Sequence, residues 1–390
     1  MPNNPNFNEF FKEFKLGSKI FADYHYLTPE YNPEKIINRE TQINQICTEL
    51  IYSLNHNTIP KNFLLYGITG TGKTATMQYI LQKIKQWSIK ENKPIPIFFF
   101  NNCAIFNTPY RIFRELCRLL NTYIPRTGLS TEIAYTQFID AVKRNKDSRI
   151  ILVLDELDFL FRNKRIGNDL LYKLIRPPLP KLISLKISIF GITNDLSLKD
   201  SFDTRIKSSL NPEEIYFPPY SALELQKILS QRAIKAFKSN VLASGLIEFI
   251  AAYFAQHNGD ARQAITVLRV SSECADKAKE SKVLEKHVKM ALKKYFEIQK
   301  QEIIQSLPYH SKKILQSIKI LQERTKVQFH ITGNVYNEYV KLCQQAGHSI
   351  LGFRQFNNHI KKLEHLNLIN TEPTYRGRRG NTRKITFYFS

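Results

Sequence analysis

The sequence predicts a parallel α/β sheet, followed by an all-helical segment and a small C-terminal domain that combines helices with a β-hairpin. Over roughly the first 220 residues, short apolar runs alternate with stretches of helical periodicity, which is typical of a buried parallel sheet. From Ser221 to about Phe296 the pattern is purely helical. After residue 300, three helical stretches precede two strand-like runs.

The composition is that of a globular protein with two or three cores. The chain has 390 residues, of which 43% are apolar, and a mean hydropathy of −0.33. It contains no run of 18 apolar residues, and its first residues lack the apolar core of a secretory signal. We therefore expect a cytoplasmic protein, associated with the chromosome, with no membrane partner.

Charge is the first feature that indicates a partner. The chain carries 57 basic and 34 acidic residues, for a net charge of +23 and a pI near 9.7. Such a large positive charge favours binding to polyanions, either nucleic acid or an anionic membrane, although it can also serve solubility alone. Residues 301–390 hold 14 basic and five acidic residues, about twice the charge density of the rest. This distribution indicates nucleic-acid binding by the C-terminal domain.

A metal held by protein ligands alone is not expected. The five cysteines are widely separated and form no CxxC pair. The nine histidines show neither an HExxH motif nor a zinc-finger spacing.

A phosphate-binding loop follows the first predicted strand. The stretch GITGTGKT, residues 67–74, matches GxxxxGK[ST], with an apolar run at residues 63–66 before it and a periodic helix after it. The glycines let backbone amides converge on phosphate oxygens. Lys73 is expected to reach the β- and γ-phosphates, and the Thr74 hydroxyl to hold Mg²⁺. A glycine-rich turn of another α/β fold is the lesser alternative.

Two carboxylates follow a second buried strand. Residues 150–154 are apolar, and Asp155 and Glu156 come at the carboxyl end. Asp155 can bind Mg²⁺ through water, and Glu156 can polarise an attacking water. A carboxylate pair can also simply begin a helix. Because this chain also contains a phosphate loop earlier in the sequence, the catalytic interpretation of the carboxylate pair is favoured.

Three further strands complete the predicted sheet. Residues 95–103 lie in sequence between the two strands above, an arrangement that indicates the subclass with a catalytic glutamate. Residues 186–193 end before Asn194, which is placed to orient water, or alternatively forms a turn. Residues 212–220 give a fifth strand and a proline-stiffened exit.

Two helices of the helical segment begin with recognisable N-terminal capping residues. Ser221 and Glu224 form a capping-box pattern, and Asp260 caps a later helix. Arg262 falls in the first turn of that helix, where the helix dipole disfavours a cation. An arginine there can reach the γ-phosphate, so we expect a helical lid whose angle depends on the nucleotide.

The last helical stretch, residues 350–368, has two distinct faces. Phe353, Phe356, Ile360 and Leu363 are expected to face inward. The opposite face carries Arg354, Asn358, Lys361 and His365. Thr332 is expected to cap the preceding helix.

Residues 368–374 and 382–389 are expected to pair as a hairpin. Its tip and following strand carry cations, including Arg376, Arg378, Arg379 and Arg383, and the tip holds no acidic residue. A polar recognition helix beside such a wing is typical of a winged-helix DNA-binding domain, in which the helix enters the major groove and the wing contacts phosphates or the minor groove. A solvated hairpin tip is the alternative.

Together these blocks resemble the archaeal origin-recognition and cell-division-cycle initiator ATPases, a branch of the AAA+ class. The resemblance covers nearly the whole chain. It rests on the order and spacing of YNPEKIINRE, GITGTGKTAT, LDELDFLF, GITNDLSL, DTRIKSSL, FPPYSALELQKILSQRA, GDARQAI and the final wing. It implies an AAA+ base at residues 39–219 after an N-terminal extension at 1–38, a lid at 220–298 and a winged helix at 299–390.

The resemblance also implies roles for single residues. Asp155 and Glu156 would be the Walker B pair, Asn194 sensor 1 and Arg262 sensor 2. Arg205 resembles an arginine finger that faces ATP on a neighbouring subunit, although it can equally be a surface cation. The nucleotide, ATP or ADP with Mg²⁺, would be bound by Gly67, Gly70, Thr71, Gly72, Lys73, Thr74 and Ala75 of the Walker A loop, and by Tyr220 and Arg232 from the lid side. The family's DNA-contacting helical insertion corresponds to NTPYRIFRELCRLL, with Arg111, Arg114 and Arg118 as candidates.

The implied function is a nucleotide-dependent switch. ATP would close the lid, the protein would grip duplex DNA at a replication origin, and it would recruit a minichromosome-maintenance-type replicative helicase. Other initiator subunits on the DNA could be further partners. Hydrolysis is expected to be slow. The alternatives are a clamp-loader-like or other DNA-remodelling AAA+ ATPase, and a DNA-binding signalling ATPase.

Overall fold

The computed structural model describes residues 18–145, 149–176, 186–366, 368–375 and 381–387. The described residues divide into two units, one up to residue 290 and the other from residue 291 onward. Within the described ranges, no helix combines the length and the apolar character needed to cross a membrane.

A five-stranded parallel sheet forms the centre of the first unit. Its strand order is β2-β3-β4-β1-β5, and every neighbouring pair is parallel. The predicted parallel sheet is thus confirmed, with strands β1 (Phe63–Tyr66), β2 (Ile97–Asn102), β3 (Arg149–Asp155), β4 (Lys186–Thr193) and β5 (Glu213–Tyr216). The strand interposed between β1 and β3 is β4, however, and not the strand at residues 95–103 from which the subclass was inferred, because β2 lies at the edge of the sheet. The strand order brings the carboxyl ends of β1, β3 and β4 to one edge, where the phosphate loop, Asp155 and Asn194 follow.

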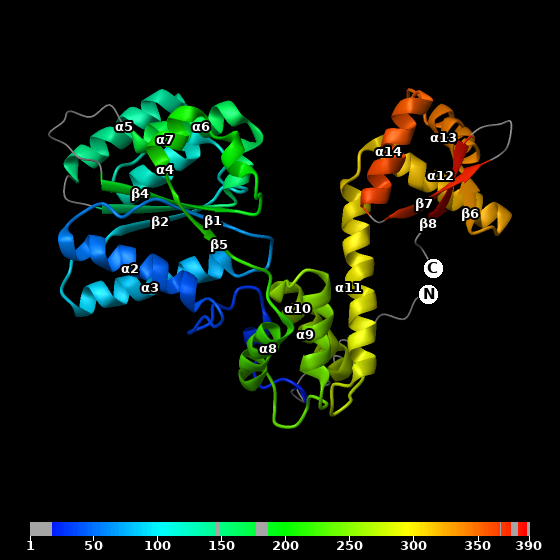
Figure 1. Ribbon diagram of the computed structural model, residues 1–390, viewed down its shortest axis with the longest axis horizontal. Helices are drawn as coiled ribbons and strands as arrows, with labels where there is room; N and C mark the ends of the chain where they lie inside the picture. Colours follow the sequence, from blue (N-terminus) through cyan, green and yellow to red (C-terminus); the bar gives the residue numbers. More distant parts are fainter. Residues whose placement is uncertain (1–17, 146–148, 177–185, 367, 376–380, 388–390) are drawn as a thin grey trace, which may run out of the picture. The chain divides into compact units, whose positions relative to one another are not determined.

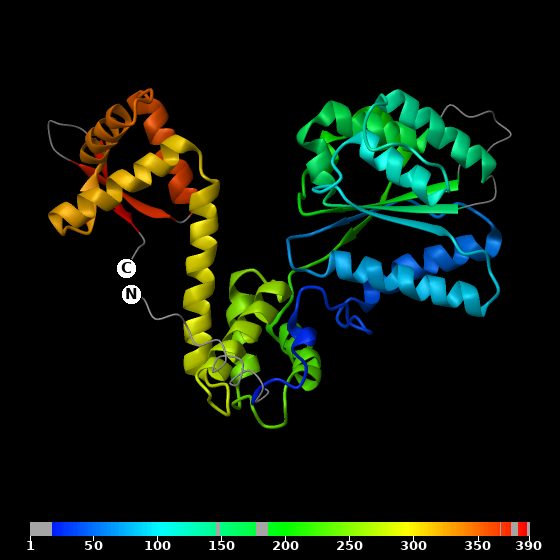
Figure 2. The same cartoon turned by 180° about the vertical axis from the view of Figure 1, so that it is seen from behind.

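Helices cover both faces of this sheet (Figures 1 and 2). One face is covered by α2 (Glu40–His56) and α3 (Lys73–Lys90), and the other by α4 (Pro109–Leu119), α5 (Thr131–Arg144), α6 (Lys164–Ile175) and α7 (Thr204–Leu210). The two cores share β3 by alternation: Ile150, Leu152 and Leu154 belong to one, and Ile151 and Val153 to the other. Short 3₁₀ helices lie at Tyr24–Leu27 (η1), Leu157–Arg162 (η2) and Leu198–Ser201 (η3).

The helical segment after the sheet comprises α8 (Ala222–Ala236), α9 (Leu246–His257), α10 (Ala261–Lys277) and the start of α11 (Glu285–Ser306). The predicted capping box is confirmed: the Ser221 N–H donates to the Glu224 carboxylate at 2.8 Å, and the Glu224 N–H donates to the Ser221 hydroxyl. Residues 18–37 pack against these lid helices. Phe21 stacks on Phe237, and the Ser18 hydroxyl donates to Asp276 at 2.9 Å.

The second unit contains α12 (Tyr309–Thr325), α13 (Thr332–Gln345) and α14 (Phe353–His365) with a three-stranded antiparallel sheet. The sheet order is β6-β8-β7, formed by β6 (Phe329–Ile331), β7 (Ile369–Tyr375) and β8 (Asn381–Phe387). Its core combines residues of all three helices with Ile385 of β8. This is the predicted winged helix, with β6 as an additional strand too short to show alternation in the sequence.

Two expectations for this unit were wrong. Phe353 is 49% exposed, because it is the first residue of α14 and lies at the end of the core, where its ring packs against those of Tyr336 and Phe356. Thr332 is already the first helical residue of α13, and its hydroxyl donates instead to the Arg383 carbonyl at 3.2 Å. Phe356, Ile360 and Leu363 are buried as expected.

Candidate nucleotide-binding site and nucleic-acid interface

The phosphate loop joins β1 to α3, and the lid approaches it closely. Gly70 and Gly72 have φ values of +73° and +86°, a region that favours glycine. A Cβ on Gly72 would lie 2.5 Å from the Tyr220 hydroxyl, and a Cβ on Gly70 would collide with the Asp260 carboxylate. Both glycines are therefore required by backbone conformation and by the space that lid residues leave.

Lys73 is buried at the start of α3. Its Nζ donates to the carbonyl oxygens of Gly67 and Ile68, each at 2.7 Å, and to Oδ1 of Asn194 at 2.8 Å. The pKa of Lys73 is lowered to about 8, mainly by burial and to a smaller extent by the nearby positive charge of Arg262. The fold thus brings three of the residues predicted for this site, Lys73, Asn194 and Arg262, close together.

The two predicted magnesium ligands meet at the same edge of the sheet. The Thr74 hydroxyl donates to Oδ2 of Asp155 at 2.9 Å, and the Glu156 N–H donates to Oδ1 at 2.9 Å. Burial raises the pKa of Asp155, although both hydrogen bonds oppose this effect. A hydroxyl beside a carboxylate is the oxygen donor set that suits Mg²⁺ when phosphate and water complete its coordination. These residues therefore fit a nucleotide-bound magnesium ion.

Glu156 lies next to this pair in an unusual backbone conformation. Its φ of +52° and ψ of +46° are left-handed, and η2 begins directly after it. A left-handed backbone conformation costs energy for any residue other than glycine, and such residues are frequent at functional sites. Glu156 thus lies on the turn after β3, whereas Asp155 is the last residue of the strand.

The N-terminus of α10 faces the phosphate loop from the lid. Asp260 caps this helix by accepting from the N–H groups of Arg262 at 2.8 Å and Gln263 at 3.1 Å. The next residue, Ala261, donates its N–H to the Gly70 carbonyl at 3.2 Å. The positive end of a lid helix is therefore held beside the loop, which favours an anion there.

A cavity of about 570 Å³ adjoins the loop. Gly70, Gly72, Thr74 and Ala75 line one side, and three residues predicted from the sequence, Tyr220, Arg232 and Arg262, line the lid side. Residues 27–33 and 35–37, to which the sequence analysis assigned no contact with the nucleotide, supply a further wall. Arg232 donates to the Tyr26 and Tyr31 carbonyls at 2.9 and 3.4 Å. Ile36, Ile228 and Ile265 make the cavity partly apolar, so it suits an aromatic base attached to phosphates.

Arg205 lies on α7 with an exposed side chain. It pairs with Asp203 at 3.0 Å, and its guanidinium lies 5.2 Å from the centre of the Tyr172 ring. Arg205 therefore lies on the surface of the base.

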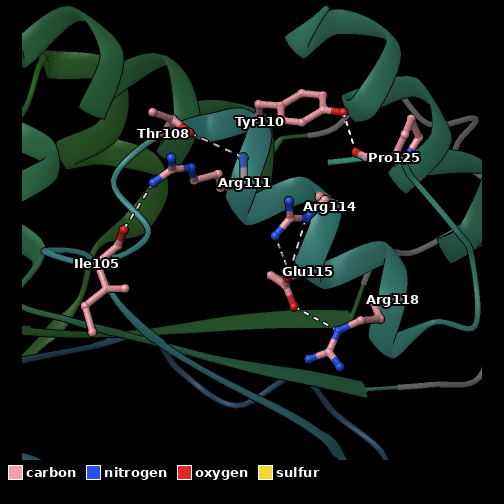
Figure 3. A network of polar contacts seen from close by, with 8 residues as sticks. All are labelled: Ile105, Thr108, Tyr110, Arg111, Arg114, Glu115, Arg118 and Pro125. Atoms are coloured by element: carbon pink, nitrogen blue, oxygen red, sulfur yellow. Dashed lines mark hydrogen bonds and ion pairs between the residues drawn. The ribbon is translucent and has the colours of Figure 1, made fainter. Parts of the chain in front are cut away.

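Three candidate DNA-contacting arginines lie on α4, and two of them pair with one carboxylate (Figure 3). Glu115 accepts from Arg114 and from Arg118, each at 2.8 Å. The Arg111 guanidinium donates to the Ile105 carbonyl at 3.5 Å. The side chain of Arg118 is 75% exposed, whereas that of Arg114 is 18% exposed. Arg111 is also exposed, so Arg111 and Arg118 are the more accessible of the three.

In the second unit, Arg354, Asn358 and Lys361 are exposed on α14. A groove of about 570 Å³ runs between this helix and the hairpin, lined by Lys361 and Arg383 together with Phe353, Asn357, Thr332, Pro373, Thr374 and Thr382. Arg383 lies 3.8 Å from Glu364. The predicted contacts Arg376, Arg378 and Arg379 lie outside the described residues.

Arg39 is a buried residue of this site that was not predicted from the sequence. It directly precedes α2, and its side chain donates to the Thr71 carbonyl of the phosphate loop at 3.0 Å. Its sequence context, INRE, contains no pattern that indicates this contact. Only the resemblance of the surrounding stretch marked it as part of a motif.

Comparison with known proteins gives three family matches along the chain. Residues 60–196 match the family model of an AAA domain, residues 226–293 that of the Cdc6 AAA+ ATPase-type lid domain, and residues 302–389 that of the CDC6 C-terminal winged helix domain. The chain is 38% identical over 375 residues to the ORC1-type DNA replication protein 1 of Archaeoglobus fulgidus, covering 96% of this chain and 90% of the relative. It is 36% identical over 377 residues to the protein of the same description from Methanosarcina acetivorans, with 96% and 89% covered.

Two solved structures are also similar. The Aeropyrum pernix ORC1 protein in complex with DNA is 32% identical, with a TM-score of 0.78 and coverage of 96% of this chain and 95% of that one. Cdc6p from Pyrobaculum aerophilum is 23% identical, with a TM-score of 0.61 and 94% of each chain covered, which bears on the fold alone.

Proposed function

Because the chain belongs to the family of archaeal ORC1/Cdc6-type DNA replication proteins, which are AAA+ ATPases with a winged helix, we propose that it is an ATP-dependent initiator that binds duplex DNA at a replication origin. The observation that carries the proposal is the combination of two sites in one chain. One is a phosphate loop closed by a lid helix, and the other is a groove with cations between a recognition helix and a hairpin.

Each residue at the phosphate loop has a proposed role. The loop amides and Lys73 bind the phosphates, Thr74 and Asp155 hold Mg²⁺, and Tyr220 and Arg232 line the nucleotide from the lid. The bound metal would supply neutralisation of phosphate charge. Glu156 and Asn194 orient the attacking water, and Arg262 contacts the terminal phosphate. The 2.8 Å contact between Lys73 and Asn194 supports this arrangement.

Hydrolysis is proposed to be slow and to reset a switch. Arg205 would complete the site of a neighbouring initiator subunit, and its exposed position on α7 supports a role in trans. A chain bound alone to DNA would then lack this cation at its own nucleotide. An arginine supplied in trans stabilises transition-state charge strongly in other phosphoryl-transfer proteins.

DNA contacts are proposed on both units. Arg354, Asn358, Lys361 and Arg383 would contact the duplex together with the wing residues Arg376, Arg378 and Arg379. Arg111, Arg114 and Arg118 of α4 would add contacts from the base. The DNA-bound state of the A. pernix protein supports this proposal, since it is 32% identical along almost the whole chain. The bound initiator would act on the chromosome and recruit a replicative helicase of the minichromosome-maintenance type.

The DNA interface can be tested by the salt dependence of duplex binding, measured by fluorescence anisotropy with the full chain. Replacement of Arg354, Lys361 and Arg383 by alanine should weaken binding and reduce the slope of log K against log salt by roughly 2 to 3, because each phosphate contact adds about 0.9 to the slope. The matched control replaces Lys312, Lys313 and Lys319 of α12. It removes the same number of positive charges at positions that do not line the groove. An unchanged slope in the first variant, or an equal loss in the control, would contradict the proposed interface.

A further inference from the structure

Arg39 is a cation buried between three segments of the first unit. It is 2% exposed, and its hydrogen bonds end on backbone carbonyl oxygens. Nε donates to Thr71 at 3.0 Å, Nη1 to Asn38 at 2.9 Å and Nη2 to Pro218 at 2.7 Å. Its guanidinium also lies 3.8 Å from the centre of the Tyr220 ring. A buried charge is costly unless it is well bonded, so this full set of contacts indicates a specific task.

The contact with Thr71 fixes part of the phosphate loop. Because a peptide unit is planar and trans, holding the Thr71 carbonyl toward Arg39 makes the Gly72 N–H of the same peptide point in the opposite direction, away from Arg39. The preceding carbonyl, that of Gly70, is held by the Ala261 N–H of the lid at 3.2 Å. Two consecutive peptide planes of the loop are therefore fixed from outside, one by Arg39 and one by the lid.

The contacts with Pro218 and Tyr220 lie on the connection from the sheet to the lid, since these residues link β5 to α8. The neighbouring Asn38 strengthens this link, because its side-chain amide donates to the Glu224 carbonyl in the first turn of α8 at 3.2 Å. A change in the angle between sheet and lid would move the acceptor and the ring that hold the guanidinium. It would thereby move the donor that fixes the Thr71–Gly72 peptide.

We propose that Arg39 is a positioning residue that couples the geometry of the phosphate loop to the connection between sheet and lid. The inference rests on the proposed nucleotide site and adds to it the route by which lid position changes nucleotide affinity. A guanidinium can do this because its rigid fork reaches several carbonyls at once and stacks on an aromatic ring, whereas a lysine ammonium presents a single point of charge.

The test compares ADP binding by full-length variants, with a fluorescent ADP analogue for affinity and thermal unfolding with and without ADP. Arg39→Met should bind ADP at least about tenfold more weakly, since a charge-assisted hydrogen bond to the loop is lost, and its unfolding temperature should respond little to ADP. Arg149→Met is the matched control: Arg149 is also buried, but it begins β3 and bonds to Asn57. The control should keep the wild-type affinity and the wild-type response to ADP even if it is less stable.

The outcomes separate coupling from general destabilisation. Arg39→Lys should give an intermediate affinity with a near-wild-type unfolding temperature, and it replaces Arg39→Met if that variant does not fold. Wild-type affinity in the Arg39 variants, or an equal loss in Arg149→Met, would overturn the inference while leaving the nucleotide site intact. A wild-type chain that binds no ADP would overturn the nucleotide site itself.

Discussion

The pKa of Lys73 leads to a prediction about nucleotide affinity and pH. In the free protein, burial and the charge of Arg262 lower this pKa to about 8. Bound phosphates favour the charged ammonium and raise the pKa again. Above pH 8, binding must therefore take up a proton, and the affinity for ADP should fall as the pH rises.

The size of the effect follows from the fraction of Lys73 that is protonated. With a pKa of about 8, nearly all of the free protein carries the proton at pH 7, and about one molecule in eleven carries it at pH 9. The affinity should therefore fall about tenfold between pH 7 and pH 9. The terminal phosphate of ADP titrates at roughly pH 6, outside this window.

The assay is a titration with a fluorescent ADP analogue at fixed ionic strength in half-unit steps from pH 6.5 to pH 9.5. Lys73→Arg is the control, because its guanidinium stays protonated throughout and its residual affinity should not change. Arg262→Met should move the midpoint to higher pH, since it removes the second cause of the shift. A flat profile for the wild type, or the same decline in Lys73→Arg, would refute this reasoning.

Three further predictions concern single side chains. Asp260→Ala removes the cap of α10 and should lower the free energy of unfolding by about 1 kcal/mol, measured by denaturant titration, and a change near zero would show that the cap is replaced. Glu156→Gln should retain ADP affinity but lose ATP hydrolysis in a single-turnover assay, and a wild-type rate would remove Glu156 from the catalytic site. Ile360→Ala creates a cavity in the core of the second unit and should cost about 2 to 5 kcal/mol there, with loss of duplex binding; an unchanged unfolding profile would contradict this packing.

The sheet and the phosphate site could be predicted because their signals are local. Five apolar runs gave the strands, and the parallel arrangement placed the residues that follow β1, β3 and β4 at one edge. The contact between Thr74 and Asp155 follows from that arrangement. Fold topology thus linked two motifs that are 81 positions apart in the sequence.

The residues that were missed depend on contacts that leave no local pattern. Arg39 donates to Thr71 and Pro218, which are 32 and 179 positions away. The packing of residues 18–37 on the lid joins residues that are still farther apart, since Ser18 and Asp276 are 258 positions apart. Phe353 had the correct spacing for the inward face of α14, but periodicity does not reveal where a core ends along a helix axis.

The central proposal is that the nucleotide bound next to the lid controls the affinity of the chain for DNA. The most direct test measures the affinity of the full chain for an origin duplex at one salt concentration, first with a non-hydrolysable ATP analogue and then with ADP. Binding should be at least about fivefold tighter with the ATP analogue, within the usual range of coupling between two sites, and Lys73→Ala should abolish the difference. Equal affinities in the two nucleotide states, or a difference that persists in Lys73→Ala, would contradict the account.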